Sequence, residues 1–160
     1  MAKPVALSLR PGDPAPSFSA IITNGTEIHS KDLLGKPVVI YFYPRDDTPG
    51  CTKEACGFRD QYAELQKTGA VVLGVSADTV KSHAKFTDKF QLPFPLISDP
   101  DAVITKAFGA WGEKVFMGRK YQGIHRVTFL IGADGRIARV WDLVKPESHA
   151  AEVLEALKAL

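Results

Sequence analysis

The chain has 160 residues, of which 45% are hydrophobic and 24% are charged, and its formal net charge at pH 7 is +2. This length and composition are typical of one globular domain with a single core. The charge is too small to indicate a nucleic-acid-binding protein, and no apolar run approaches the ~20 residues that a membrane span needs. We therefore expect one domain over 1–160 with no nucleic-acid partner and no membrane partner.

The start of the chain offers only a short apolar cluster, Val5–Leu9, before Pro11 and Gly12. A secretory signal needs a longer apolar segment. Two closely spaced cysteines also do not make the disulfide framework of a secreted protein; in a reducing compartment such a pair is more often reactive or metal-binding. We expect a cytoplasmic protein.

Hydrophobic patterning and turn residues predict alternating strands and helices. Residues 1–17 are rich in proline and are expected to be extended, and 109–123 is expected to be an irregular surface excursion. The expected strands are 18–22, 26–29, 38–43, 70–75, 96–98, 126–131 and 137–141; the expected helices are a short turn over 30–35 and longer segments over 52–68, 76–90, 99–108 and 147–160.

Several of these elements carry a clear physical signal. Asn24 and Gly25 are a strong hairpin turn signal between the first two strands. Val38–Tyr43 is apolar without alternation, which is typical of a strand covered on both faces. Asp134 and Gly135 predict a second hairpin near the end of the chain. The order of elements predicts an α/β fold, with a central mixed β-sheet flanked by helices and an N-terminal β-hairpin.

Both cysteines lie immediately after the strand over 38–43. Cys51 follows Pro49 and Gly50 and is expected in the first turn of a helix. There the positive end of the helix dipole and the free backbone N–H groups favour a thiolate over a thiol. The alternative is a buried, inert cysteine, but the tight turn at Pro49 and Gly50 argues against a purely packing role. We expect Cys51 to be a nucleophile.

Ionisation of Cys51 alone would not account for an enzymatic reaction rate. A free cysteine of pKa about 8.5 is already ~3% thiolate at pH 7, so full ionisation gains at most ~30-fold. Enzymatic accelerations are far larger, so other groups must orient the substrate and stabilise its developing charge. The Thr48 hydroxyl and the backbone N–H groups of Gly50 and Cys51 are suitable nearby groups.

An arginine from a distant part of the fold would complete this set. Arg126 is the leading candidate, because it opens the apolar strand 127–131 and belongs at the mouth of the sheet. The alternative is an ordinary surface arginine at a strand end. Arg45 is closer to Cys51 in sequence, but it lies beside Asp46 and Asp47, which could pair with it.

Cys56 lies five positions after Cys51. On a continuous helix this spacing is a rise of ~7.5 Å and a rotation of roughly 140°. A disulfide needs Cα atoms within ~7 Å and converging Cβ vectors, so the pair cannot bridge while the helix is intact. Reaction between the sulfurs would require the first helical turns to unwind. The alternative is that Cys56 packs beneath the helix and never reacts.

A zinc site would need two more ligands than the cysteines supply. The chain has four histidines, dispersed singly, and each is expected to be a surface or capping residue. They are His29, His83, His125 and His149. Glycine-rich nucleotide loops and a serine nucleophile elbow are also absent from the sequence. We therefore expect neither a metal nor an organic cofactor.

The residues around the cysteines resemble those of the peroxiredoxins, and most closely the bacterioferritin comigratory protein branch, also called peroxiredoxin Q. The stretches that carry the resemblance are Tyr43–Thr52, Glu54–Cys56, Phe58–Asp60 and Gly123–Ile131. The similarity extends from about Gly12 to the C-terminal helix. The pattern Pro-x3-Thr-x2-Cys, with a distant arginine before Thr-Phe, is highly specific.

The resemblance implies a thioredoxin-like fold and the reduction of hydrogen peroxide and organic hydroperoxides. It implies that Cys51 is the peroxidatic cysteine, which becomes a sulfenic acid. Thr48 and Arg126 would hold the peroxide, together with the backbone at Gly50, and Pro44 would shield the pocket.

Cys56 resembles the resolving cysteine of family members that carry it in the same helix. Its disulfide with Cys51 would then be reduced by thioredoxin, or by glutaredoxin. The branch leans towards monomers, so the resemblance implies a monomeric enzyme.

Two other functions remain open at this point. A general thiol–disulfide oxidoreductase is disfavoured, because the cysteines have the spacing C-x4-C instead of C-x-x-C. A redox sensor or holdase is the non-enzymatic alternative; disulfide-driven unwinding would expose Ala55, Phe58 and other apolar surface to a partner.

Overall fold

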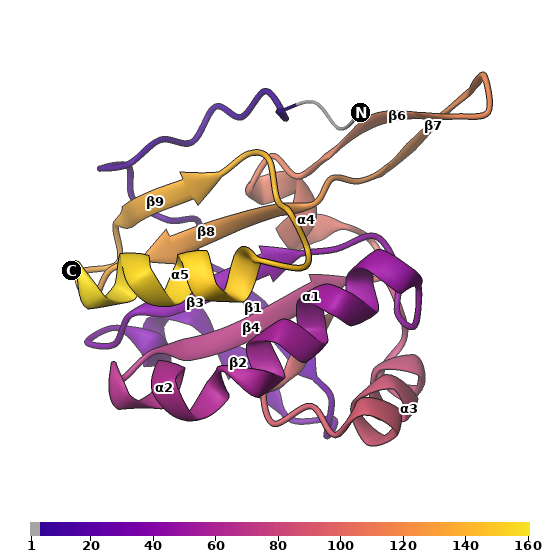
Figure 1. The fold of residues 1–160 in the computed structure, drawn as a ribbon. Coiled ribbons are helices and arrows are strands. Elements are labelled where there is room, and N and C mark those ends of the chain that lie inside the picture. Colours follow the sequence, from indigo (N-terminus) through magenta and orange to yellow (C-terminus); the bar gives the residue numbers. More distant parts are fainter. Residues whose placement is uncertain (1–3) are drawn as a thin grey trace.

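The computed structural model describes residues 4–160, which form a mixed β-sheet, a separate β-hairpin, five α-helices and one 3-10 turn (Figure 1). The strands are β1 (Ser19–Ile22), β2 (Glu27–His29), β3 (Val38–Phe42), β4 (Val71–Ser76), β5 (Leu96–Ser98), β6 (Trp111–Phe116), β7 (Arg119–Ile124), β8 (Val127–Ile131) and β9 (Ile137–Trp141). The helices are η1 (Ser30–Leu33, the 3-10 turn), α1 (Pro49–Asp60), α2 (Tyr62–Lys67), α3 (Val80–Phe90), α4 (Val103–Ala107) and α5 (His149–Lys158).

The main sheet has seven strands in the order β2-β1-β5-β4-β3-β8-β9. Strand β3 is parallel to β4 and antiparallel to β8, and β4 is parallel to β5. Strands β1 and β2 form the expected N-terminal hairpin, and β8 and β9 form the second expected hairpin. The predicted α/β class with a mixed central sheet is confirmed.

The side chains of β3 explain its unbroken apolar sequence. Val39 and Tyr41 belong to the hydrophobic cluster on one face of the sheet, whereas Val38, Ile40 and Phe42 belong to the cluster on the other. Successive side chains of a strand point to opposite faces. All five residues of β3 are buried, because both faces of the sheet are covered.

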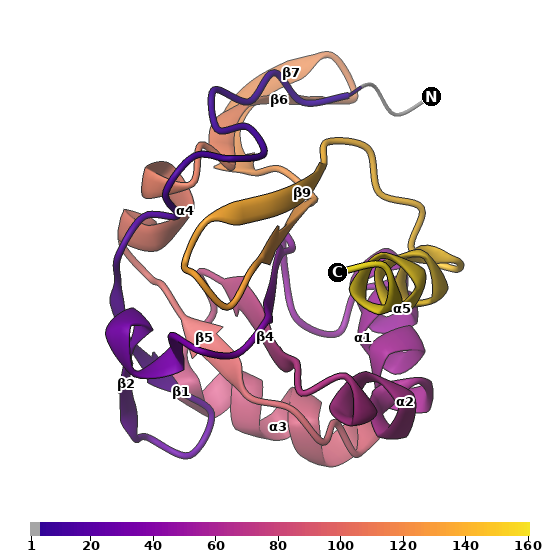
Figure 2. The same ribbon diagram turned by 90° about the vertical axis from the view of Figure 1, so that its left-hand side faces the viewer.

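Helices cover the two faces unequally (Figures 1 and 2). The helices α1, α2 and α5 pack on one face, where Ala55, Phe58 and Leu65 join the same cluster as Leu154. The short helix α4 and the N-terminal segment lie on the opposite face, where Phe108 is fully buried. Helix α1 therefore starts at one end of β3 and runs over a large apolar core.

The segment 109–123 is the surface excursion that the sequence predicts, but the prediction of its conformation is wrong. It is not irregular; it is largely an antiparallel hairpin of β6 and β7 that projects from the body of the molecule (Figure 1). Its two-residue turn consists of Met117 (φ 51°) and Gly118 (φ 79°). Two consecutive residues with positive φ are typical of a type I′ hairpin turn, which usually favours Asn, Asp or Gly at the first position. Because methionine occupies that position, the usual turn signal is missing and the sequence does not predict the hairpin.

The helix boundaries also differ from those predicted. The expected helix over 52–68 begins earlier, at Pro49, and is divided into α1 and α2 by Gln61, whose backbone (φ −96°, ψ 2°) leaves the helical region. The helices α3 and α5 begin at Val80 and His149, each a few residues later than predicted. Across residues 4–160, no helix has both the length and the apolar character needed to cross a membrane.

Close packing beneath α1 predicts a stability effect at Gly74. A Cβ atom on Gly74 would lie 2.8 Å from Leu96 Cδ2 and 2.8 Å from the ring of Tyr41. Gly74→Ala should therefore lower the free energy of unfolding in urea by about 1–3 kcal/mol, because the buried ring must shift.

Gly57→Ala is the matched control for this substitution. Its Cβ would make an ordinary contact of 3.4 Å with Ala150, and alanine is favoured over glycine inside a helix. We expect no loss of stability there. Equal unfolding midpoints for the Gly74→Ala variant and the wild type would contradict the packing described.

Candidate active site

The guanidinium of Arg126 contacts two side chains of helix α1. Arg126, between β7 and β8, donates from Nη2 to Cys51 Sγ at 3.1 Å and from Nη1 to Glu54 Oε1 at 2.6 Å. Cys51 and Glu54 are both buried on α1, three residues apart and therefore on one face of the helix. The structure thus brings Arg126 to Cys51, as the sequence predicts, and adds Glu54 as the residue that holds the arginine.

The local sequence places Cys51 in the first turn of α1. Thr48 is the N-cap, Pro49 is the first helical residue, and Cys51 is the third. The first backbone bond of the helix runs from Thr52 N to Thr48 O at 2.8 Å, so the N–H groups of Gly50 and Cys51 precede the hydrogen-bonded ladder. The first turn of α1 contains no acidic residue to offset its positive dipole end.

Gly50 permits the close approach of the arginine. A Cβ atom at this position would lie 3.2 Å from Arg126 Nη2 and 3.9 Å from Pro146 Cγ. A larger side chain would therefore crowd the guanidinium that contacts Cys51. The small residue is needed for space, because the backbone of Gly50 does not have a positive φ.

Thr48 and Pro44 belong to the loop that leads into α1, and both are partly exposed. The hydroxyl of Thr48 donates to the backbone oxygen of Arg45 at 3.0 Å. Among the hydrogen bonds of residues 4–160, this hydroxyl contacts neither Cys51 nor Arg126. Its proton is committed to Arg45, so its lone pairs are free to accept a hydrogen bond from a ligand.

Glu54 is the main site residue that sequence reasoning missed. It is fully buried, and burial raises its pKa from 4.5 to about 7, although the charge and hydrogen bond of Arg126 act in the opposite direction. The sequence contained one signal that could have identified Glu54: it lies three residues after Cys51, on the same face of the predicted helix. Burial alone would lower the pKa of Arg126, but the charges of Glu54 and Cys51 raise it. The arginine therefore remains charged.

Two further basic groups lie near the guanidinium. Lys114 on β6 donates from Nζ to Ile124 O at 2.8 Å, and its pKa is lowered by burial and by Arg126. The pKa of His125 is lowered by burial and by Lys114. The β6–β7 hairpin thus contributes a positive charge close to the segment that carries Arg126.

Cys56 lies on the same continuous helix as Cys51. Both cysteines are free thiols, with Cys51 buried and Cys56 partly exposed. Because α1 is unbroken from Pro49 to Asp60, the spacing argument applies directly: the two sulfurs cannot bond without unwinding of the helix.

The loop residues Asp46 and Asp47 do not pair with Arg45, contrary to the possibility raised from the sequence. Asp46 contacts His83 Nδ1 at 2.7 Å, and Asp47 contacts Lys89 Nζ at 2.8 Å. Both partners come from α3. The first pair is buried and the second is exposed, while Arg45 itself lies at the surface.

Two histidines also depart from the sequence prediction, which placed every histidine at the surface or at a cap. His83 and His149 are both fully buried. His149 Nε2 lies 2.7 Å from Thr128 Oγ1, and burial lowers the pKa of His149 to about 4. Both lie among aromatic side chains, so their hydrophobic surroundings bury them despite their polarity.

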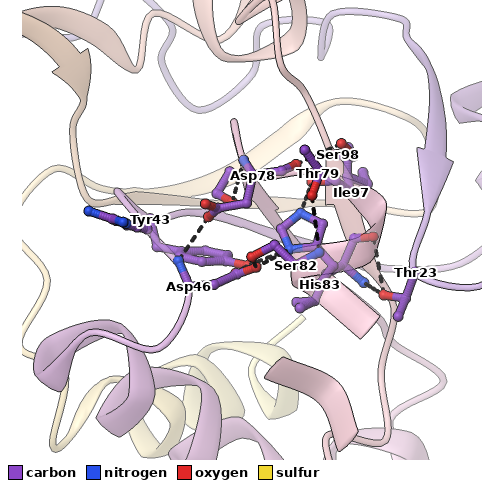
Figure 3. A network of polar contacts seen from close by, with 12 residues as sticks. Thr23, Tyr43, Asp46, Asp78, Thr79, Ser82, His83, Ile97 and Ser98 are labelled. Carbon is purple, nitrogen blue, oxygen red and sulfur yellow. Dashed lines mark hydrogen bonds and ion pairs between the residues drawn. The ribbon is translucent and has the colours of Figure 1, made fainter. Parts of the chain in front are cut away.

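One group of potential metal ligands occurs among the described residues. Side-chain atoms of Asp46, Asp78 and His83 lie within 4.8 Å of one another. These side chains already form hydrogen bonds with the protein: His83 with Asp46, and Asp78 with Ser76 Oγ. A metal would have to replace those bonds, so the cluster is better described as a hydrogen-bond network (Figure 3).

Comparisons with known proteins place the chain in one family. The model of the AhpC/TSA family matches residues 11–140. The chain is 49% identical to a putative peroxiredoxin bcp of Coxiella burnetii over 151 residues, which are 94% of this chain and 100% of that protein. It is 47% identical to peroxiredoxin Bcp of Escherichia coli, covering 94% of this chain and 96% of that one.

Solved structures agree with the fold. A peroxiredoxin Q variant from Xylella fastidiosa superposes with a TM-score of 0.91 at 39% identity, covering 96% of this chain and 98% of that one. The bacterioferritin comigratory protein of Xanthomonas campestris, described for its alkyl peroxide reduction activity, superposes with a TM-score of 0.87 at 40% identity, covering 96% and 98%. The expected thioredoxin-like fold is confirmed.

The raised pKa of Glu54 predicts how stability varies with pH. Its folded-state pKa of about 7 exceeds its ordinary value of 4.5. The folded protein therefore binds a proton that the unfolded chain releases between these values. The resulting stabilisation, at most about 3 kcal/mol, is fully present below pH ~4.5 and is lost as pH rises through ~7.

Glu54→Gln removes this titration. In urea unfolding of the reduced protein, the wild type should lose stability relative to the Glu54→Gln variant between pH 5 and pH 8. The comparison cancels the contributions of groups that both proteins share. If the difference in the free energy of unfolding between the two proteins stays constant from pH 5 to pH 8, Glu54 keeps its ordinary pKa in the folded state.

Proposed function

The chain belongs to the AhpC/TSA family as a peroxiredoxin of the Q branch, and on that premise we propose that it reduces hydrogen peroxide and organic hydroperoxides through a sulfenic acid on Cys51. The observation that carries this proposal is the hydrogen bond from Arg126 Nη2 to Cys51 Sγ. It holds a permanent positive charge beside the attacking atom, where negative charge is present at the start of the reaction and transferred during it.

The proposed first step is an in-line displacement at oxygen. The Cys51 thiolate attacks the O–H oxygen of the hydroperoxide, so that an S–O bond forms as the O–O bond breaks. The leaving alkoxide, or hydroxide from hydrogen peroxide, takes a proton from water, which replaces the proton released when the thiol ionised, and departs as an alcohol or as water. Cys51 is oxidised to the sulfenic acid, and the two electrons that reduce the peroxide come from its sulfur. We therefore propose that no metal or organic cofactor is required.

The residues around Cys51 supply the matching polar groups. Arg126 can donate to the peroxide and stabilise the leaving oxygen, and the N–H groups of Gly50 and Cys51 are further donors at the helix start. Thr48 gives its own proton to Arg45 O at 3.0 Å. The Thr48 oxygen can therefore accept a hydrogen bond from the O–H group of the hydroperoxide. Pro44, in the same loop, would shield this pocket from water.

The second step requires a change in α1. The Cys56 thiol attacks the sulfenic sulfur of Cys51, a disulfide forms, and water is released. Because both residues lie in one continuous helix, its first turns must unwind before the sulfurs meet. A dithiol reductant, thioredoxin or alternatively glutaredoxin, would then restore both thiols and allow α1 to refold. We further propose that the enzyme is monomeric and cytoplasmic.

A redox sensor or holdase is the second candidate, and one observation favours it. Ala55 and Phe58 of α1 are fully buried, so unwinding would expose apolar surface that a partner could bind. This function needs no repeated turnover of peroxide. A general thiol–disulfide oxidoreductase is disfavoured by the need to unwind the helix before the disulfide can form.

The deciding experiment follows peroxide consumption with thioredoxin and its reductase. Cys51→Ser should abolish turnover, because it removes the attacking sulfur. Cys56→Ser should allow one oxidation event per chain, with recycling only by small thiols, because the sulfenic acid has no internal partner. Wild-type turnover in the Cys51→Ser variant would eliminate the proposed function. A single oxidation without turnover in the wild type would favour the sensor.

Arg126→Ala should slow oxidation of Cys51 by hydrogen peroxide by about 10²–10³-fold, the usual cost of removing one donor that stabilises developing charge. Alkylation by iodoacetamide, a neutral reagent with no peroxide oxygen to stabilise, should slow much less. Stopped-flow measurement of both rates in the Cys56→Ser background makes the comparison. Equal slowing of the two reactions would mean that the arginine acts only on the thiol.

A further inference from the structure

We propose that His83 is a positioning residue for peroxide reduction, which clamps Asp46 through a buried side-chain contact and thereby fixes the loop that orients Thr48. The inference rests on the proposed function, in which Thr48 accepts a hydrogen bond from the hydroperoxide. His83 lies on α3 and is separated in the sequence from both Thr48 and Cys51. It would act on the substrate only through the loop.

The clamp is a buried network between the loop and its neighbours (Figure 3). Asp46 Oδ2 lies 2.7 Å from His83 Nδ1 and accepts from Ser82 Oγ at 2.8 Å, while Oδ1 accepts from the Tyr43 hydroxyl at 2.6 Å. The backbone N–H of Asp46 donates to Asp78 Oδ2 at 2.8 Å. Both the main chain and the side chain of Asp46 are therefore held.

The partners of the ring hold His83 on both sides. Nε2 lies 2.9 Å from the backbone oxygen of Ile97, which can only accept, so Nε2 carries a proton. Nδ1 lies 2.7 Å from Asp46 Oδ2 and 3.5 Å from the Tyr43 hydroxyl. The side chains of His83 and Asp46 are 0% and 4% exposed, so both partners of the contact are buried.

The clamp reaches Thr48 through one peptide unit. Arg45 directly precedes Asp46, and its backbone oxygen receives the Thr48 hydroxyl at 3.0 Å. Fixing Asp46 fixes the position of that oxygen. The oxygen in turn directs the Thr48 proton away from the site and leaves the lone pairs of Thr48 available. A displaced loop would turn this hydroxyl, and small misplacements of a positioning group can cost ~10²-fold in rate.

The same loop carries an exposed ion pair that makes a useful contrast with the buried contact between His83 and Asp46. Lys89 Nζ contacts Asp47 Oδ2 at 2.8 Å, but these side chains are 59% and 46% exposed. Exposed pairs contribute little. If the function of His83 were only to tether α3 to the loop, Lys89 would be an equivalent tether.

The test compares two reactions of Cys51 in the Cys56→Ser background. His83→Leu should lower the rate constant for oxidation by hydrogen peroxide at least ~10-fold. Alkylation by iodoacetamide should change less than ~2-fold, because it does not use Thr48. His83→Gln, whose amide can restore one of the two hydrogen bonds, should recover part of the rate. Lys89→Met, the matched control, should leave both reactions within ~2-fold of the wild type.

The contact itself is tested by the nitrogen chemical shifts of the His83 ring. Asp46→Asn should move the Nδ1 resonance, because it changes the group that Nδ1 faces, and should leave Nε2, which faces Ile97 O, much less affected. An Nδ1 shift that is the same in both proteins would overturn the clamp.

A folded His83→Leu variant that is oxidised at the wild-type rate, or that loses both reactions equally, would overturn the positioning role. If His83→Leu does not fold, the same comparison is made with His83→Gln, and a wild-type oxidation rate there has the same consequence. Failure of the parent Cys56→Ser protein to react with peroxide would instead refute the proposed function. The ring shifts would still report on the clamp in that case.

Discussion

The site depends on one arginine that is shared between a carboxylate and a sulfur. Glu54 holds one terminal nitrogen of Arg126 at 2.6 Å, and this fixes the other nitrogen 3.1 Å from Cys51 Sγ. Both acceptors lie on one face of α1, and Gly50 leaves room for the guanidinium. The fold positions these groups: the loop after β3 leads into the first turn of α1, and Arg126 lies in the connection between β7 and β8.

The proposed mechanism places two opposing requirements on helix α1. The helix must be intact to hold Cys51 and Glu54 against Arg126, and in the proposed second step it must unwind for Cys56 to reach Cys51. The buried contacts of Asp46 are consistent with both requirements, because they hold a residue that precedes the helix and is not part of it. The loop that carries Thr48 can therefore remain in place while the first turns of α1 open. The cost of opening lies in exposing Ala55, Phe58 and the buried Glu54.

The sequence was sufficient for features that depend on local pattern and for Arg126 as the leading partner of Cys51, but not for the other contacts between distant segments. Val38–Tyr43 had the apolar run of a doubly covered strand, and Cys51 followed a helix start signal, so both were predicted. The β6–β7 hairpin was missed because Met117 occupies a turn position that usually favours Asn or Gly. Glu54 and His83 look like ordinary surface residues until α1 and α3 are packed, because burial and pairing with Arg126 and Asp46 arise only in the fold.

The most direct test of the shared arginine is a crystal structure of the Cys51→Ser variant with a bound hydroperoxide, which this variant cannot reduce. The bound hydroperoxide should lie within hydrogen-bond distance of both the Arg126 guanidinium and Thr48 Oγ1, with the O–O bond in line with the side chain of residue 51. Arg126 should still contact Glu54. A hydroperoxide bound elsewhere, or one that contacts neither Arg126 nor Thr48, would contradict the proposed convergence of these three positions.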